Sequence, residues 1–297
     1  MRITTNTVQD NIVSQIQNLS TKQAKLQTQV STGQRIFQPE DDPASVGRTL
    51  NLQSEQRKIT QYASNATRAL ELSQATFSGL NAIKTVSDRA SEIATLGSGA
   101  LSSSQSQAYA TEVNQLIEQT LELANSRFGT DYLFGGTKLD TAPFAATRTD
   151  GKITAVSYEG NSEQVSLPLS ESATVSPTTD EATNLSLRDF LKNLIDLRDS
   201  LDTNNSSGLA TAQAALIDSE DVLVASLARN GGIQTRIEAH QDQLKDRSTE
   251  LEKLVSGEVD VDLPETIVKL TQTQTAYEAA LQSSVKIMQI SLLDYIN

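Results

Sequence analysis

The 297-residue sequence contains no cysteine, no tryptophan and only one histidine, His240. Without cysteine there are no disulfides, no thiolate metal ligands and no cysteine nucleophile. With a single histidine the chain has few residues to offer for Ser-His-Asp catalysis, and it cannot form a metal site of several histidines. Aromatic residues make up only 4% of the chain, so few large side chains are available to fill a thick core. We therefore predict no enzyme activity and no catalytic, cofactor-binding or metal-binding residues.

Long apolar runs and basic tracts are also missing. No stretch of about 18 apolar residues exists, so no membrane span is expected. The N-terminus lacks an apolar segment and a small-residue cleavage site, so no Sec-type signal peptide is expected either. Lys and Arg number 24 against 37 Asp and Glu, a net charge of −13, and without clustered bases nucleic-acid binding is not predicted.

The acidic residues are concentrated in the middle of the chain. Residues 131–265 carry the whole net charge of −13, whereas residues 1–130 and 266–297 are neutral overall. The middle therefore suits exposure to water, and the two ends suit packing against other surfaces.

Both ends of the chain have the pattern of helices that pair with another helix. Residues 6–30 and 266–297 contain no glycine or proline. In the first segment apolar residues recur with heptad spacing, and in the second they are mostly three or four residues apart. The residues predicted to form these seams are Ile12, Ile16, Leu19, Leu26 and Val30, and Leu270, Tyr277, Leu281, Val285, Met288 and Leu292.

Two long helices are predicted after the first seam. Asp42 is a candidate N-cap, with Pro43 at the first helical position, and the helical period then continues to about Leu96. At 1.5 Å per residue, such a helix is roughly 80 Å long. A second helix is expected from about Ser104 to Phe128.

The character of the sequence changes after residue 130. Turn residues and β-formers dominate from Tyr132 to Leu169, and Asp150-Gly151 between short alternating runs indicates a hairpin. Extended segments are expected at 153–158 and 165–167, and an exposed Ser/Thr-rich loop at 170–184.

Helical periodicity returns from Leu187. A long helix is predicted from Leu209 to about Leu254, with an interruption at Gly231-Gly232. Asp262 with Glu265 resembles a capping box for the last helix.

The expected fold is mainly α. It is an elongated rod of long antiparallel helices, with coiled-coil-forming helices at both termini and a small β-containing insertion. Five segments are predicted. They are an N-terminal assembly helix with a loop (1–42), a first rod segment (43–130), an outer insertion (131–185), a second rod segment (186–262) and a C-terminal assembly helix (263–297).

Two clusters with possible chemistry have simpler explanations. Glu40-Asp41-Asp42 has the composition of a cation site, but a capped helix start explains it better. Gly135-Gly136-Thr137 lacks the lysine and the strand-to-helix context of a phosphate loop and is better explained as a turn.

The terminal seams allow two interpretations. They form an ordinary intramolecular hairpin, or they are assembly surfaces that are fully covered only by several neighbours. We favour assembly surfaces, because narrow stripes interrupted by Gln23, Gln274 and Ser284 bury too little area for an isolated helix pair.

Several segments resemble the bacterial flagellin superfamily. The N-terminal signature is Gln29–Ile36 followed by Asp41-Asp42-Pro43-Ala44. Tyr132–Thr137 with Pro143-Phe144, and the ending Ala279–Ile296, resemble the members found at the junction between hook and filament. The resemblance covers roughly residues 1–145 and 263–297.

This resemblance implies a structural protein of the bacterial flagellum that is exported through the flagellar type III apparatus without a cleaved signal. It would be extracellular and would form a ring with copies of itself between hook-associated protein 1 and the flagellin filament. Before export a chaperone would hold the C-terminal helix. No cofactor, nucleic acid or membrane insertion is implied.

Three alternatives remain at this point. A minor filament flagellin shares the terminal signatures and differs at Tyr132–Phe144 and Ser291–Ile296. An enzyme or metal-binding module inserted at 131–184 would need ligand-like spacing of acids, which this segment lacks. A helical adhesin or chaperone-like coiled coil would not need the Asp41-Asp42-Pro43 signature.

Overall fold

The computed structural model describes the backbone of residues 5–99 and 102–296, with side chains described between residues 10 and 286. Six helices and three two-stranded sheets are formed by these residues. They divide into two compact units, a smaller one of residues 1–58 and 248–297 and a larger one of residues 59–247. The boundaries of the units fall inside two long helices, so each of these helices contributes to both units.

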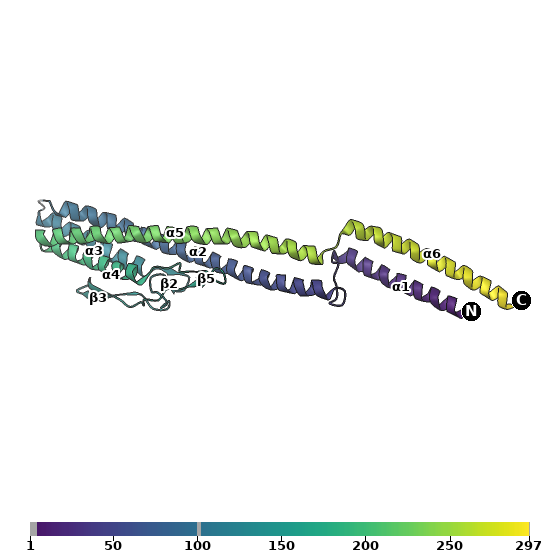
Figure 1. The fold of residues 1–297 in the computed structure, drawn as a ribbon. Coiled ribbons are helices and arrows are strands. Elements are labelled where there is room, and N and C mark those ends of the chain that lie inside the picture. Colours follow the sequence, from purple (N-terminus) through teal and green to yellow (C-terminus); the bar gives the residue numbers. More distant parts are fainter. Residues whose placement is uncertain (1–4, 100–101, 297) are drawn as a thin grey trace. The chain divides into compact units, whose positions relative to one another are not determined.

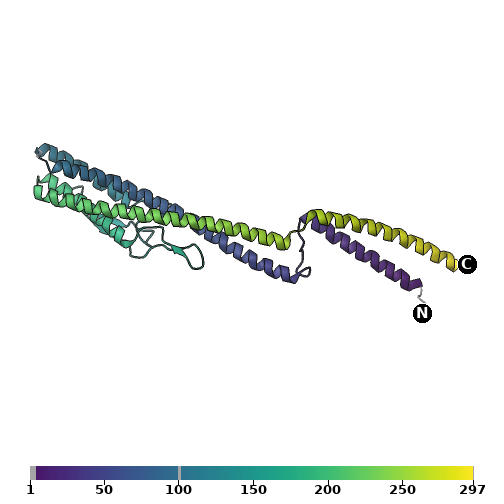
Figure 2. The ribbon, with the colours of Figure 1, turned by 45° about the horizontal axis from the view of Figure 1, so that its top comes forward.

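The smaller unit contains both terminal helices. Helix α1 spans Thr5–Thr32 and helix α6 spans Leu263–Ile296, and the two lie side by side (Figures 1 and 2). Helix α1 ends where Gly33 adopts a positive φ of 71° and donates its N–H to the Gln29 carbonyl at 2.9 Å. The predicted terminal helices are thus confirmed, and a glycine ends the first of them.

The two longest helices begin and end near the predicted residues, but one of them lacks the interruption that was predicted in its interior. Helix α2 spans Pro43–Gly97 and helix α5 spans Ser206–Val259. The interruption predicted at Gly231-Gly232 is wrong, because α5 continues through both glycines. Each glycine costs a helix about 1 kcal/mol, and the burial of Leu223 and Ile237 on either side offsets that cost.

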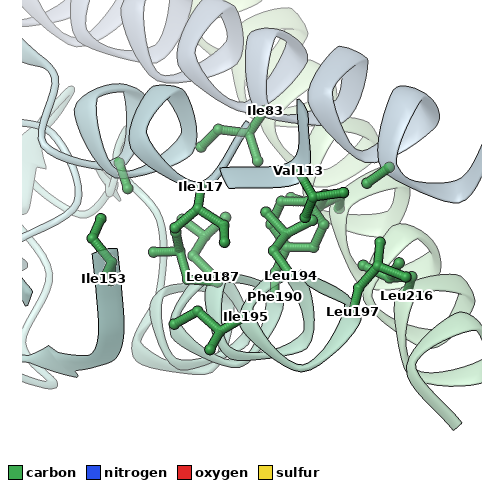
Figure 3. Close-up of a cluster of buried hydrophobic side chains, with 14 of the residues drawn as sticks. Ile83, Val113, Ile117, Ile153, Leu187, Phe190, Leu194, Ile195, Leu197 and Leu216 are labelled. Atoms are coloured by element: carbon green, nitrogen blue, oxygen red, sulfur yellow. The ribbon is translucent and has the colours of Figure 1, made fainter. Parts of the chain in front are cut away.

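The larger unit is built around a main apolar core. Helices α3 (Ser103–Ala124) and α4 (Glu181–Asp202) pack against each other, and α2 and α5 complete the bundle (Figures 1 and 3). Among the side chains that meet in this core are ten from the four helices and one strand, namely Ile83, Val113, Ile117, Ile153, Leu187, Phe190, Leu194, Ile195, Leu197 and Leu216.

Helix α3 is shorter than predicted. It begins with a capping box between Ser102 and Gln105, and it ends at Ala124 rather than at Phe128. The chain leaves the helix because the Asn125 side chain bonds the backbone of a distant strand. Its Oδ1 accepts from the Phe144 N–H at 3.0 Å, and its Nδ2 donates to the Phe144 carbonyl at 2.9 Å.

The β insertion consists of three antiparallel pairs. They are β1 (Arg127–Phe128) with β2 (Asp131–Tyr132), β3 (Phe144–Thr149) with β4 (Lys152–Tyr158), and β5 (Leu167–Pro168) with β6 (Thr174–Val175). The predicted hairpin at Asp150-Gly151 is confirmed, with φ of 52° and 78° at these two residues, the combination that a tight two-residue turn requires.

The segment after β5 differs from its prediction. Residues 170–184 were expected to be an exposed loop, but they include β6 and the first turn of α4. Val175 is buried in a second apolar cluster, in which the β5–β6 hairpin packs against α2 and α5. Thr179 and Asn184 are also buried, and the Thr179 hydroxyl donates to Asn184 Oδ1 at 2.6 Å. The mainly-α fold with a small β insertion is confirmed.

Candidate assembly surface

Helix α1 turns its predicted seam toward α6. Leu26 is 7% exposed, and Ile12, Ile16, Leu19 and Val30 are half-buried, while most other side chains of the helix are exposed. The heptad spacing keeps these side chains on one stripe along the helix. The intramolecular partner of this stripe is α6.

The buried stripe of α6 differs from the predicted one. Leu270 and Tyr277 are half-buried, but the most buried positions are Thr266 and Thr273, at 4% and 6% exposure. Each threonine hydroxyl donates at 2.7 Å to a carbonyl one turn earlier in its own helix, which satisfies it and permits burial. Thr266, Thr273 and Ala280 are small residues spaced seven apart. This spacing indicates the side of α6 that α1 covers, and a search for large apolar residues alone does not find it.

The larger apolar side chains of α6 are left uncovered. Leu281 is 40% exposed and Val285 is 55% exposed, so pairing with α1 does not cover them, and their place in an assembly interface stays a prediction. The side chains of Met288 and Leu292 lie outside the described residues. Further exposed apolar residues of the two terminal helices are Val13, Leu263, Ile267 and Val268. We define the α6 apolar face as Ile267, Leu281 and Val285.

Backbone hydrogen bonds join the loop after α1 to the loop before α6. The Arg35 N–H donates to the Val259 carbonyl at 2.7 Å, and the Val261 N–H donates to the Gly33 carbonyl at 2.9 Å. Gln34 and Asp260 form an antiparallel bridge between them. Segments more than 220 residues apart in the sequence are therefore tied together at the base of the terminal helices.

Charged side chains reinforce this junction. The Arg48 Nε and Nη2 donate to the two carboxylate oxygens of Glu258, each at 2.9 Å, a bidentate pair. Arg35 donates from Nη2 to the backbone carbonyl of Glu258 at 2.9 Å. The hydrogen bond from Arg48 lowers the pKa of Glu258 and raises that of Arg48 itself. We call Arg35, Asp42, Ser45, Arg48 and Glu258 the junction cluster.

The Asp41-Asp42 pair is fully engaged by the protein. Asp42 caps α2 by accepting the Ser45 N–H at 3.0 Å and the Ser45 hydroxyl at 2.7 Å, and these bonds lower its pKa. Asp41 accepts from the Lys25 ammonium at 2.6 Å and from the N–H groups of Phe37 and Gln38. The Lys25 hydrogen bond, then those from the backbone, lower the pKa of Asp41 to about 2. The predicted role of Asp42 as an N-cap is confirmed.

Two negative findings complete the description. Within residues 5–99 and 102–296, no group of three or more His, Cys, Asp or Glu side chains is arranged to hold a metal ion. In the same part of the chain, no helix has the combination of length and apolar character needed to cross a bilayer.

Comparisons with known proteins show what the chain is similar to. Residues 3–139 match the family model of the bacterial flagellin N-terminal helical region. Its relatives include the flagellar hook-associated protein 3 of Escherichia coli, which is 26% identical over 98% of both chains. The Salmonella typhimurium protein of the same name is 34% identical over 146 residues, a match that spans 48% of this chain and 46% of that protein.

Solved structures share the fold. A putative flagellar hook-associated protein from Vibrio parahaemolyticus superposes with a TM-score of 0.67 at 19% identity, covering 74% of this chain and all of that one. Bacillus cereus FlgL superposes with a TM-score of 0.60 at 17% identity, covering 69% and 99%. At these identities the likeness concerns the fold alone.

Proposed function

We propose that this protein is a non-enzymatic structural component of the bacterial flagellum that joins the hook to the flagellin filament. The observation that carries the proposal is the alignment with Escherichia coli flagellar hook-associated protein 3 over 98% of both chains. The flagellin-type N-terminal region supports the same assignment. The spread of the similarity over both helical ends and the insertion favours a junction protein over a minor filament flagellin.

Assembly would proceed through the terminal helices. Pairing of α1 with α6 covers the stripes that face each other and leaves the α6 apolar face in water. Burying such side chains is favourable by roughly 25 cal/mol for each Å² of apolar surface. Neighbouring copies in a ring supply the missing cover, so that Ile267, Leu281 and Val285 become buried only in the assembly. The α6 apolar face is presented by the pair of α1 and α6. This pair is held together by the half-buried residues of α1 and by Leu270 and Tyr277 of α6.

The partners that we propose follow from the same role. They are copies of the chain in a ring, hook-associated protein 1 on one side and flagellin on the other. Before secretion a flagellar export chaperone would cover the apolar face of α6, which otherwise promotes aggregation. Export without a cleaved signal and an extracellular location belong to this proposal.

Substitution of Leu281 by aspartate tests the assembly role. Leu281 is 40% exposed in the free chain, so Leu281→Asp leaves the subunit folded and secreted at near wild-type level. In the ring the new aspartate would be buried without a partner for its charge. We therefore expect incorporation of the variant into the hook–filament junction to fall roughly tenfold or more. The measurement is the ratio of protein on purified hook structures to protein in the medium, in cells that lack the wild-type copy.

Gln282→Asp is the matched control, since Gln282 is a neighbouring exposed polar position on the same helix. It should assemble normally. Leu281→Asp protein found on hook tips at wild-type amounts would disprove the proposed interface. Long filaments grown from the purified wild-type protein would instead favour a filament flagellin.

A further inference from the structure

Helix α5 passes through two adjacent glycines, Gly231 and Gly232, in its middle part. A Cβ added at either position would meet no atom within 4 Å, so packing within the described chain does not require glycine there. Gly79 on α2 is different, because a Cβ there would lie 3.1 Å from the Phe134 ring. The two glycines of α5 therefore act on the backbone, since glycine holds the helical conformation less firmly than alanine does.

The glycine pair lies between two separate apolar clusters. On its N-terminal side, Leu216 and Leu223 of α5 belong to the main core that α3 and α4 complete. On its C-terminal side, Ile237 and Leu244 belong to the second cluster, which α5 shares with α2 and the β5–β6 hairpin. Among the described residues, α5 has no fully buried apolar side chain between Leu223 and Ile237. Each part of the helix is thus anchored independently, and the glycines lie in the span between the anchors.

The support of α5 changes at the same level. Helix α4 begins there, because its N-cap Asp180 accepts a hydrogen bond from Arg229 of α5. Before residue 229, α5 lies along α4, and the Asn193 side chain donates to Ser219 Oγ at 3.0 Å. After residue 229, α4 no longer accompanies α5 (Figure 1). The helix therefore leaves the four-helix bundle just before Gly231.

The contact between α2 and α5 at this level is polar. The Ser73 hydroxyl donates to Asn230 Oδ1 at 3.1 Å, and both side chains are buried. Gln234 Nε2 donates to the same oxygen at 2.9 Å. Three residues further along α2, the buried Thr76 hydroxyl donates to the Leu72 carbonyl at 2.9 Å, an arrangement that favours bending of a helix. The two helices thus meet at a polar pivot, where a change of angle exposes little apolar surface.

Open space beside the pivot leaves room for movement. A pocket of about 390 Å³ lies between β6, the start of α4 and α5, and its lining includes Thr178, Asn230 and Arg236. Asn230 precedes the glycine pair and Arg236 follows it, so the pocket spans the point in question. Bending of α5 narrows or widens this pocket, and no side chain projects from the glycines themselves.

We propose that Gly231 and Gly232 form a hinge, at which the α2–α5 pair bends where it leaves the four-helix bundle. The continuous α5 of the structure is the main conformation, and the bent one is a minor conformation. Bending turns the second cluster relative to the main core and leaves both closed, because the glycines absorb the change in φ and ψ. The half-buried Leu167, which packs against both clusters, limits the range of the movement. The hinge follows from the fold and does not depend on the partners proposed above.

Distance measurement between two spin labels tests the hinge, and the absence of cysteine allows the labels to be placed at chosen sites. Asp218→Cys and Asp246→Cys put them at exposed positions of α5, 28 residues apart, with the glycines between them. A straight helix separates these positions by about 42 Å. We expect double electron–electron resonance of the labelled full-length protein to show this distance together with a shorter population. Combining Gly231→Ala with Gly232→Ala should reduce the shorter population roughly tenfold or more, because each alanine favours the helical backbone.

Gly257→Ala is the matched control. Gly257 is a further glycine of α5 at which an added Cβ meets no atom within 4 Å, and it lies outside the labelled span. This change should leave the distance distribution as it is. The proposal is overturned by a single distance of the straight helix before any glycine is changed, by a shorter population that survives both alanines, or by its equal loss in Gly257→Ala.

Discussion

The two units differ in how they are held together. Among the described side chains, Leu26 and Leu251 are the buried apolar residues of the smaller unit, and the other buried apolar residues lie in the larger unit. The larger unit closes a core of Leu, Ile and Phe side chains from four helices (Figure 3). We expect a unit with such a core to be stable by itself, and we expect a unit of paired helices with an uncovered face to gain order from neighbours.

The largest effect is expected from removing a central side chain of the larger core. Phe190 is fully buried, so Phe190→Ala should destabilise this unit by about 3–5 kcal/mol. Leu26→Ala, a truncation in the smaller unit, should leave the main unfolding transition in place. Urea unfolding followed by circular dichroism measures both. Equal shifts of the main transition would show that the two units unfold as one.

Hydrogen exchange should separate the units without any substitution. In the purified monomer, amides of residues 6–30 and 270–295 should exchange roughly 100-fold faster than those of α3 and α4, because the terminal helices lack a closed core. Mass spectrometry of peptides from both regions checks this. Strong protection of the terminal helices would mean that they are complete without partners, and the assembly interpretation would fail.

Acid should loosen the smaller unit through its carboxylates. Asp41, Asp42 and Glu258 have pKa values below their usual range in the folded protein. Such groups stabilise the fold above the pKa of the unfolded chain and lose this contribution as the pH falls through the folded value. For Asp41, with a folded pKa of about 2, the loss extends from about pH 5 to pH 2.

This loss can be followed by hydrogen exchange at the base of α1 and α6 across that range. Glu258→Gln should be loosened already at neutral pH, and its dependence on acid should be smaller than that of the wild type. Protection factors, which are exchange rates corrected for the intrinsic effect of pH on amide exchange, that do not change between pH 6 and pH 3 would show that the junction cluster contributes nothing to the order of this unit.

The smallest effect is expected from the glycines of α5. An added Cβ at Gly231 or Gly232 meets no atom within 4 Å, so each change to alanine should stabilise the helix by about 0.5–1 kcal/mol. Urea unfolding measures the gain. Gly136→Ala is the opposing control, since Gly136 has φ of 69° and its Cβ would meet Asn161 Oδ1. Destabilisation by Gly231→Ala would indicate that α5 bends there in solution.

Local signals in the sequence predicted most of the elements. The cap at Asp42, the glycine after α1 and the turn at Asp150-Gly151 depend on residues within a few positions of each other, so their geometry follows from backbone chemistry alone. The heptad stripe of α1 was visible for the same reason. Predictions failed where a distant partner decided the outcome, as at Asn125, where bonds to Phe144 end α3 early.

The sequence by itself thus determined where helices and the main hairpin form, because helix propensity, capping and turn chemistry act over a few residues. The tertiary structure decided that Thr266 and Thr273 face α1 while Leu281 and Val285 face water, that Arg48 meets Glu258, and that Arg236 and Thr178 share a pocket. These arrangements depend on which surfaces meet after the chain folds back on itself. Contacts between residues hundreds of positions apart leave no local pattern.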